Sequence, residues 1–307
     1  MKIEEYKGYK ITDDDISYLK DIYEKKEKFT LVDKYNDEIV NVFENLVLNT
    51  YDHNSFVKLA LLSERLIRNG KEPKEFELGL KISYNLIDLG EKELEKNDDH
   101  ILGYRLSDLY LILSFIINDS GFKTLPYWHM AEKYNIKKDD KLALSYLQKA
   151  ILLNPNSNEI KLQLGMYYYN KKNYYFAYDY LIGVKDVYSG KWPYFEDKAG
   201  MAHFFTEMGV FFDNNKNGNL NGYRVFWCFK ASYLLLKDEE NIDKDTFIST
   251  RYNMACAYYK GIGVQEDHKE GKKYLDELAL GLSSKYNEDI LKINDPDGII
   301  KEYYKPE

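Results

Sequence analysis

Residues 127–155 read YWHMAEKYNIKKDDKLALSYLQKAILLNP, and residues 161–189 read KLQLGMYYYNKKNYYFAYDYLIGVKDVYS. The two stretches match at a constant offset of 34 residues. The matched pairs are Ala131 with Gly165, Tyr134 with Tyr168, Ala143 with Ala177, and Leu147 with Leu181. Small and apolar residues that recur at this offset predict a repeated pair of antiparallel helices. The small residues let the two helices of a pair approach closely, because a larger side chain would push them apart.

The ends of the copies support the same interpretation. Pro155 stops the second helix of the first copy, and Ser157 or Asn158 can cap the next helix. The two copies resemble the tetratricopeptide repeat. The second copy departs from the family pattern at two positions, because Lys161 stands where an aromatic residue is usual and Ser189 replaces the terminal proline.

A further stretch, NMACAYYKGIGVQEDHKEGKKYLDELAL at 253–280, is similar to the longer Sel-one-like variant of this repeat. Gly261 and Gly263 predict a wide turn between the helices in which φ is positive. Asp267 is expected to cap the second helix. Gly271 occupies a position at which the family has a small residue, normally alanine. The resemblance implies an all-α fold, an α-solenoid of antiparallel helix pairs.

The resemblance covers about 124–280 and suggests a division of the chain. Residues 1–120 are predicted to form an acidic N-terminal helical region of degenerate repeats. Residues 121–307 are predicted to hold the repeats and a C-terminal capping helix. The formal net charge of −8 falls within the first region, since residues 1–120 contain 17 Lys and Arg against 25 Asp and Glu.

The segment DNNKNGNLNG at 213–222 has two interpretations. The spacing of its oxygen-bearing side chains resembles a calcium-binding EF-hand loop, and the candidate ligands are Asp213, Asn215, Asn217, Asn219 and Asn221. The segment also lies where the turn between two paired helices is expected. We favour the turn, because Arg224 stands at the twelfth position, where the calcium loop needs a bidentate carboxylate.

No catalytic constellation is recognisable in the sequence. The five histidines form no metal-binding pair, and no nucleophile motif, dinucleotide fingerprint or phosphate loop is present. Cys228 and Cys256 make neither a disulfide framework nor a CxxC site. Cys256 is a candidate for an accessible thiol, but a small apolar residue on a packed helix face is the favoured interpretation, and Cys228 is expected in the core. We expect no cofactor and no catalytic residues. The longest apolar run, at 109–117, is too short to span a bilayer, and a cytoplasmic location is expected.

The resemblance implies a concave groove lined by the first helix of each pair. Carried over by alignment, the groove residues are Trp128, Glu132, Asn135, Glu159, Leu162, Met166, Tyr169, Asn170, Thr206, Val210, Asp213, Tyr252, Cys256 and Tyr259. The set contains no Lys or Arg, which argues against a groove that clamps a chaperone's terminal carboxylate. An apolar helix or an extended peptide suits it better.

Three functions are therefore distinguished. The favoured one is a non-enzymatic scaffold that binds a protein or peptide partner in the groove, with no role for nucleic acid or membrane. The alternative is an immunity or inhibitor protein that neutralises a basic toxin through its acidic N-terminal part. An enzyme with an unrecognised site is the least favoured, because no acid, base and nucleophile converge in the sequence.

Overall fold

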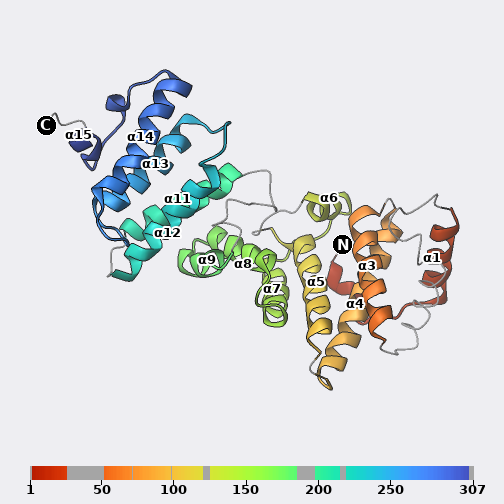
Figure 1. The fold of residues 1–307 in the computed structure, drawn as a ribbon. Helices are drawn as coiled ribbons and strands as arrows, with labels where there is room; N and C mark the ends of the chain where they lie inside the picture. The colour runs from red at the N-terminus through yellow and green to blue at the C-terminus, as the bar shows by residue number, and fades with distance from the viewer. Residues whose placement is uncertain are drawn as a thin grey trace. The chain divides into compact units, whose positions relative to one another are not determined.

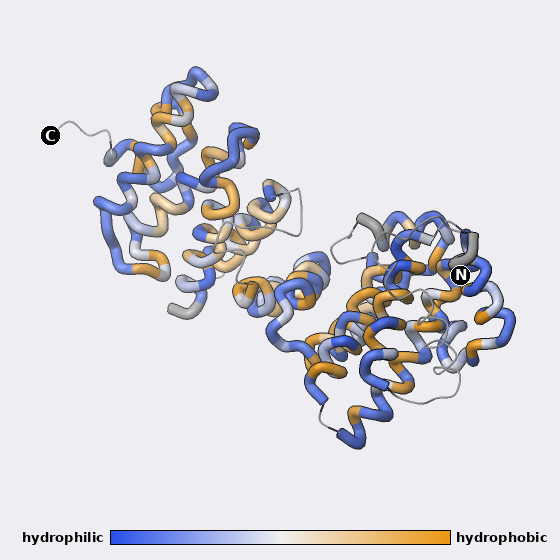
Figure 2. Tube along the Cα trace, turned by 45° about the vertical axis from the view of Figure 1, so that its right-hand side comes forward, coloured by the Kyte–Doolittle hydropathy of each residue, from blue (hydrophilic) through white to orange (hydrophobic). Residues whose placement is uncertain are grey.

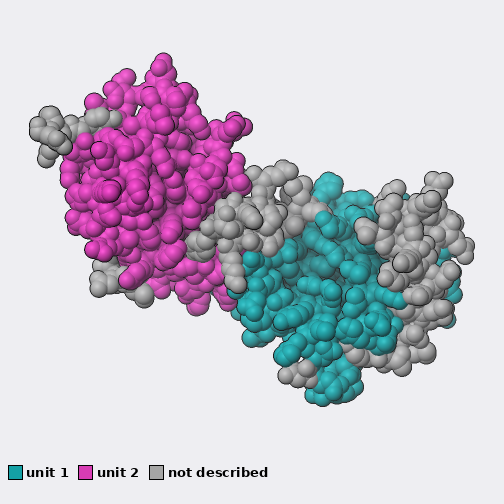
Figure 3. Space-filling view, viewed as in Figure 1, with its two compact units in different colours: residues 1–170 teal, residues 171–307 magenta. Residues whose placement is uncertain are grey.

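The computed structural model describes residues 2–25, 52–70, 72–97, 99–119, 125–184, 198–214 and 219–303. Their regular structure is helical, and none of these residues lies in a β-strand, so the predicted all-α class is confirmed. The chain divides into two compact units, unit 1 at Met1–Asn170 and unit 2 at Lys171–Glu307 (Figures 1 and 3). Within each unit the hydrophobic segments lie along the packed helices, while the connecting turns are mainly hydrophilic (Figure 2).

Unit 1 is a set of packed helices around one apolar helix. Its elements are η1 (Ile3–Tyr6), α1 (Asp13–Lys25), α3 (His53–Asn69), α4 (Pro73–Leu94), α5 (His100–Ile117), α6 (Leu125–Lys133), α7 (Asp140–Leu153) and α8 (Asn158–Asn170). Helices α3 and α4 form a close pair, because a Cβ at Gly79 would lie only 2.8 Å from Ile67 Cγ1 and 3.0 Å from Ser63 O. Gly70 ends α3, as glycine commonly does at the end of a helix.

Helix α5 is the core of unit 1. It packs against α3, α4, α6 and α7. Among the described residues it is the one helix long and apolar enough to cross a membrane, but 72% of it is buried inside the structure. Burial against neighbouring helices accounts for its apolar composition.

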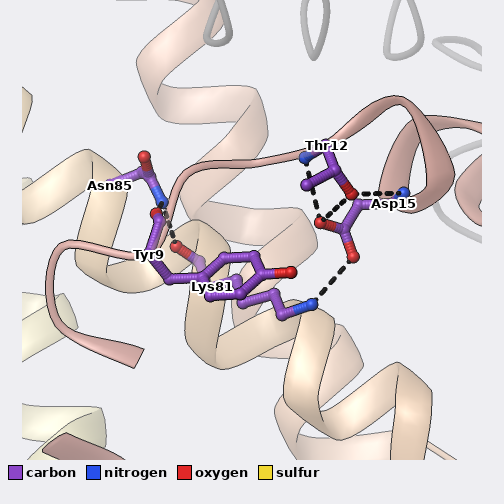
Figure 4. Close-up of polar contacts among 5 residues, drawn as sticks. All are labelled: Tyr9, Thr12, Asp15, Lys81 and Asn85. Carbon is purple, nitrogen blue, oxygen red and sulfur yellow. Dashed lines mark hydrogen bonds and ion pairs between the residues drawn. The ribbon is translucent and has the colours of Figure 1, made fainter. Parts of the chain in front are cut away.

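The start of the chain is attached to α4 by polar contacts (Figure 4). Thr12 and Asp15 form the reciprocal bonds of a capping box at the start of α1: Thr12 N donates to Asp15 Oδ2 at 3.0 Å, and Asp15 N donates to Thr12 Oγ1 at 3.3 Å. The other carboxylate oxygen of Asp15 accepts from Lys81 Nζ at 2.9 Å. Lys81 Nζ also lies 4.1 Å from the centre of the Tyr9 ring, and Asn85 Nδ2 donates to Tyr9 O at 2.8 Å. Asp15 thus both caps α1 and ties it to α4.

The first predicted repeat is arranged differently from the expectation. The sequence suggested that residues 127–155 form one pair of antiparallel helices. In the structure α7 packs chiefly on α5 and also on α8, while α6 packs on α5 and α3. The reason is that α5 offers a long apolar surface, whereas α6 has only nine residues. Ala131 and Ala143 are nevertheless buried, as expected of closely packed positions.

Unit 2 contains two clear helix hairpins. Its elements are α9 (Tyr174–Leu181), α11 (Lys198–Asn214), α12 (Asn219–Leu236), α13 (Lys244–Tyr259), α14 (His268–Gly281), η2 (Leu282–Tyr286), η3 (Ile290–Lys292) and α15 (Ile299–Tyr303). Helix α11 packs on α12, and α13 packs on α14. Each pair meets at a glycine: a Cβ at Gly209 would lie 2.5 Å from Phe229 Cε1, and one at Gly271 would lie 2.4 Å from Tyr259 Cδ2. A larger residue at either position would separate the pair.

The turn between α13 and α14 agrees with its sequence. Gly261 and Gly263 have φ of +62° and +67°, so both occupy the left-handed region that glycine tolerates best. Asp267 caps α14, because its carboxylate accepts from Glu270 N at 2.9 Å. Val264, in the same turn, is half-buried.

The boundary between the units differs from the expected division at residue 120. It lies between Asn170 and Lys171, so the second predicted repeat has its first helix, α8, in unit 1 and its second helix, α9, in unit 2. Helices α5 and α7 lie on opposite sides of residue 120 but pack together, which keeps residues 125–170 with unit 1.

Candidate functional site

The predicted groove residues differ widely in their exposure. Five are buried, four are half-buried and four are exposed. The buried ones are Leu162, Met166, Tyr169, Tyr252 and Cys256; the half-buried ones are Glu159, Thr206, Asp213 and Tyr259; the exposed ones are Glu132, Asn135, Asn170 and Val210. Trp128 belongs to α6, but its side chain lies outside the described part. The set divides between the units, with residues 128–170 in unit 1 and residues 206–259 in unit 2.

Two of the half-buried residues serve helix packing. Thr206 Oγ1 lies 2.9 Å from Ser232 Oγ, and this contact ties α11 to α12. The Tyr259 ring covers the close approach at Gly271, and its centre lies 4.6 Å from that of His268. Both side chains therefore help to set the geometry of the hairpins in unit 2.

On α13, two of the predicted groove residues, Tyr252 and Cys256, are covered by Asp295 and Asp297 of the same chain. Tyr252 OH donates to Asp295 Oδ1 at 2.9 Å and accepts from Asp297 N at 3.2 Å. Cys256 Sγ donates to Asp297 Oδ2 at 3.3 Å. Burial, followed by the charge of Asp297, raises the pKa of Cys256, so the thiol is neither exposed nor activated. The favoured interpretation of Cys256 as a packed residue therefore holds and the accessible thiol is wrong. Cys228 is likewise buried, with a raised pKa.

A cleft of about 810 Å³ opens where the hairpin ends of unit 2 meet. It is lined by the end of α11, the start of α12 and the turn after α13; the residues are Phe212, Asp213, Asn221, Gly222, Tyr223, Val225, Lys260, Gly261, Ile262, Gly263, Val264 and Gln265. The turn rests directly on α12, since a Cβ at Gly263 would lie 2.0 Å from Gly222 O. The Tyr223 side chain is 57% exposed at the cleft. Backbone, apolar and charged groups thus line one concave surface.

The charge in this cleft is mixed. Burial alone would lower the pKa of Lys260, but its ion pair with Asp297 and the charge of Asp213 outweigh burial and raise it. Lys260 therefore carries a positive charge next to the Asp213 carboxylate. Arg224 Nη1 donates to Asn221 Oδ1 at 3.1 Å, which places a second cation at the edge of the cleft.

These cations bear on the calcium hypothesis. Asp213 and Asn221 both line the cleft, but each has a cationic side chain nearby. Asn219 begins α12, and its side chain is not described; Asn215 and Asn217 lie outside the described residues. Within the described ranges, no group of three or more His, Cys, Asp or Glu residues is placed to hold a metal ion.

Arg224 also has an aromatic setting that sequence reasoning missed. Its guanidinium lies 5.0 Å from the centre of the Tyr175 ring, 5.6 Å from that of Tyr178 and 5.7 Å from that of Phe212. Such cation–π contacts hold α9 against the α11–α12 hairpin. The run of tyrosines at 174–180 was the only signal in the sequence for this arrangement.

Unit 1 brings together three carboxylates from three helices: Glu64 of α3, Asp108 of α5 and Glu159 of α8. Burial raises the pKa of Asp108, and Glu64 adds to the rise. Burial also raises the pKa of Glu159, with further contributions from Asp108 and Glu64. Tyr127 OH donates to Glu64 Oε1 at 2.9 Å. Only Glu159 of this acidic cluster was singled out from the sequence, because the other two carboxylates show no motif.

The arrangement defines an all-helical protein whose helices pack in neighbouring pairs, with a mixed polar and apolar cleft at the hairpin ends of unit 2. No protein-family profile, no curated protein and no solved structure matches the chain.

Proposed function

We propose that this protein is a non-enzymatic scaffold that binds a segment of a partner protein. The α13–α14 hairpin is the observation that carries the proposal. Its two positive-φ glycines, the cap at Asp267 and the small residue at Gly271 all agree with the Sel-one-like pattern. Proteins built from such repeats act through extended binding surfaces. We therefore infer an α-solenoid of tetratricopeptide and Sel-one-like repeats in the cytoplasm, with no cofactor and no nucleic-acid or membrane partner.

The cleft in unit 2 is the best candidate for the binding surface. It combines an exposed aromatic residue, Tyr223, with apolar groups at Ile262 and Val264 and with polar groups at Asp213 and Lys260. Aromatic residues surrounded by polar groups are typical anchors for partner proteins. The buried positions Leu162 and Met166 are less suited to this role, because a partner would have to displace their packing.

The test compares Tyr223→Ala with Tyr104→Ala, a change to a tyrosine of unit 1 that is 46% exposed. Each full-length protein is immobilised and incubated with extract of the host cells, and the captured proteins are identified by mass spectrometry. The wild-type protein and the Tyr104 variant are expected to retain the same specific partner, while the Tyr223 variant loses most of it. If Tyr223→Ala captures the partner as well as the wild type does, the assignment of the cleft is wrong. If the wild type captures nothing specific, the scaffold function is wrong.

A second candidate is an immunity or inhibitor protein for a basic toxin. Asp108 and Glu159 of unit 1 favour it. Burial and nearby carboxylates raise the pKa of both groups, although Arg105 and Arg68 offset part of the rise, and a cationic partner would stabilise their charged forms. A toxin gene beside this gene would supply the partner to test. The association rate with that toxin should then fall steeply as salt is added, and Asp108→Asn with Glu159→Gln should weaken the dependence. An association rate that does not respond to salt would exclude steering by these carboxylates.

A further inference from the structure

A segment of the chain lies across the α13–α14 hairpin of unit 2. We call residues 289–303 the strap. It contains η3, the turn Asp295-Pro296-Asp297-Gly298 and α15. Gly298 has a φ of +74°, which this tight turn requires and which glycine adopts at little energetic cost. Helix α15 packs on both α13 and α14.

The turn of the strap is bound by one row of side chains on α13. Tyr252, Cys256 and Lys260 are four residues apart and therefore lie on the same helical face. Tyr252 contacts both aspartates of the turn, since it donates to Asp295 Oδ1 and accepts from Asp297 N. Cys256 donates to one oxygen of Asp297, and Lys260 forms an ion pair with the other. All three side chains of the row thus recognise two acidic residues that are two positions apart.

The strap is anchored by three buried isoleucines and by polar contacts, which on α14 join His268 to Glu302 at 3.4 Å and Tyr303 to Asp276. Ile290, Ile299 and Ile300 are buried, whereas most of the turn between them is exposed or half-buried. The side chains of the Lys260–Asp297 ion pair are 41% and 34% exposed, and ion pairs of that kind contribute little to stability. Segments with few buried apolar contacts open locally at a lower free energy than the core does. We therefore expect the turn of the strap to open from α13 while the hairpin stays folded.

We propose that the Tyr252–Cys256–Lys260 row is a docking site for a tight turn with two aspartates two residues apart. In the free protein the strap occupies this site, and a partner protein that presents such a turn takes its place. The proposal rests on the proposed function as a protein-binding scaffold. It specifies the chemistry of the partner: a carboxylate for Lys260 and Cys256, and a second carboxylate for the Tyr252 hydroxyl.

The test uses the two cysteines of the full-length protein as reporters. Cys256 lies beneath the strap, while Cys228 is buried in α12 and serves as an internal control. The native protein is treated with iodoacetamide, and alkylation at each cysteine is followed by mass spectrometry. Asp295→Asn with Asp297→Asn should raise the alkylation rate of Cys256 about tenfold, because an ion pair and hydrogen bonds that close the strap are weakened. The rate at Cys228 should not change.

A matched control is Asp238→Asn with Glu240→Gln, which changes the net charge equally at exposed positions outside the strap. It should leave the alkylation of Cys256 unchanged. A synthetic peptide of residues 293–303, INDPDGIIKEY, added in excess to the double-aspartate variant should restore protection of Cys256. The same peptide with both aspartates replaced by asparagine should not.

The proposal is overturned if the double-aspartate variant leaves Cys256 as protected as in the wild type, or if both peptides protect equally. If Cys228 and Cys256 become reactive together, the variant has unfolded; Lys260→Met, which removes the same ion pair from α13, then repeats the comparison. Unchanged protection of Cys256 in that variant also overturns the proposal. None of these results affects the capture experiment with Tyr223, which tests the scaffold function separately.

Discussion

The turn between α13 and α14 allows a direct test of how tightly the hairpins of unit 2 pack. Gly261 and Gly263 both have positive φ, so alanine at either position places a side chain in the left-handed region. Their surroundings differ. A Cβ at Gly261 would have its nearest neighbours at 3.4 Å, an ordinary contact, whereas one at Gly263 would lie 2.0 Å from Gly222 O and 2.6 Å from Tyr223 N. The neighbour at Gly263 is backbone, which cannot rotate away.

The expected magnitudes follow from these contacts. The left-handed conformation costs alanine about 1–2 kcal/mol, and the smaller entropy of the unfolded chain offsets roughly 0.4–1 kcal/mol of it. Gly261→Ala should therefore lower the free energy of unfolding by about 0.5–1 kcal/mol. Gly263→Ala adds an overpacking term of roughly 1–3 kcal/mol and should lower it by about 2–4 kcal/mol in total.

The measurement is equilibrium urea unfolding followed by far-ultraviolet circular dichroism. The midpoint of the transition that involves unit 2 should fall for both variants and clearly further for Gly263→Ala. Because both glycines belong to one turn, Gly261→Ala is a matched control for the backbone effect. Equal losses of stability in the two variants would refute the inference that the turn is pressed against the start of α12.

Four further predictions concern burial, charge and ions. Asp15→Asn should destabilise the protein by roughly 3 kcal/mol near neutral pH, because it leaves the largely buried Lys81 ammonium without its charged partner. Burial tends to raise the pKa of Asp15, but hydrogen bonds from Lys81 and Thr12 outweigh burial and lower the pKa below 3.8. The stabilisation from the Asp15–Lys81 ion pair should therefore be complete at a pH above 3.8 and be lost as the pH falls further. Thermal melts at a series of pH values measure this loss. Met166→Glu should unfold unit 1 or lower its free energy of unfolding by more than about 3 kcal/mol, because the change buries a carboxylate without a partner. A variant that melts at the temperature of the wild type would contradict the burial of Met166 on α8. Glu159→Gln should stabilise the protein by about 0.5 kcal/mol at pH 7, and because the pKa of Glu159 is raised, the gain should shrink as the pH falls through that pKa. Millimolar calcium should leave the melting temperature unchanged, and a rise of several degrees would instead support a calcium site at residues 213–221.

Much of the local structure follows from short-range chemistry and could be predicted from the sequence. The glycine turn at 261–263, the cap at Asp267 and the glycine stop at Gly70 all agree with their sequence patterns. Each depends on backbone conformation or on a hydrogen bond between residues no more than four apart. The small residue at Gly271 was also predicted, because the steric need for a small side chain recurs in every closely packed pair.

The candidate site was predicted only in part. Asp213 was selected from the sequence and lines the cleft, whereas Tyr223 and Lys260 were not selected. Tyr252 and Cys256 were assigned to an open groove, but the strap covers them. The contact between Asp297 and Lys260 joins residues 37 positions apart, and such contacts have no local signature in the sequence.

The amino-acid sequence by itself thus determined that the described chain is helical, where its hairpin turns lie and which positions must stay small. Only the tertiary structure decided that α7 packs on α5, that the chain divides into its two units between residues 170 and 171, and that the strap covers Tyr252 and Cys256 of α13. The physical reason is that helix periodicity, caps and turns depend on neighbours within about one helical turn. The choice of partner for an apolar face depends instead on which other faces compete for it across the whole unit, and no short stretch of sequence contains that information.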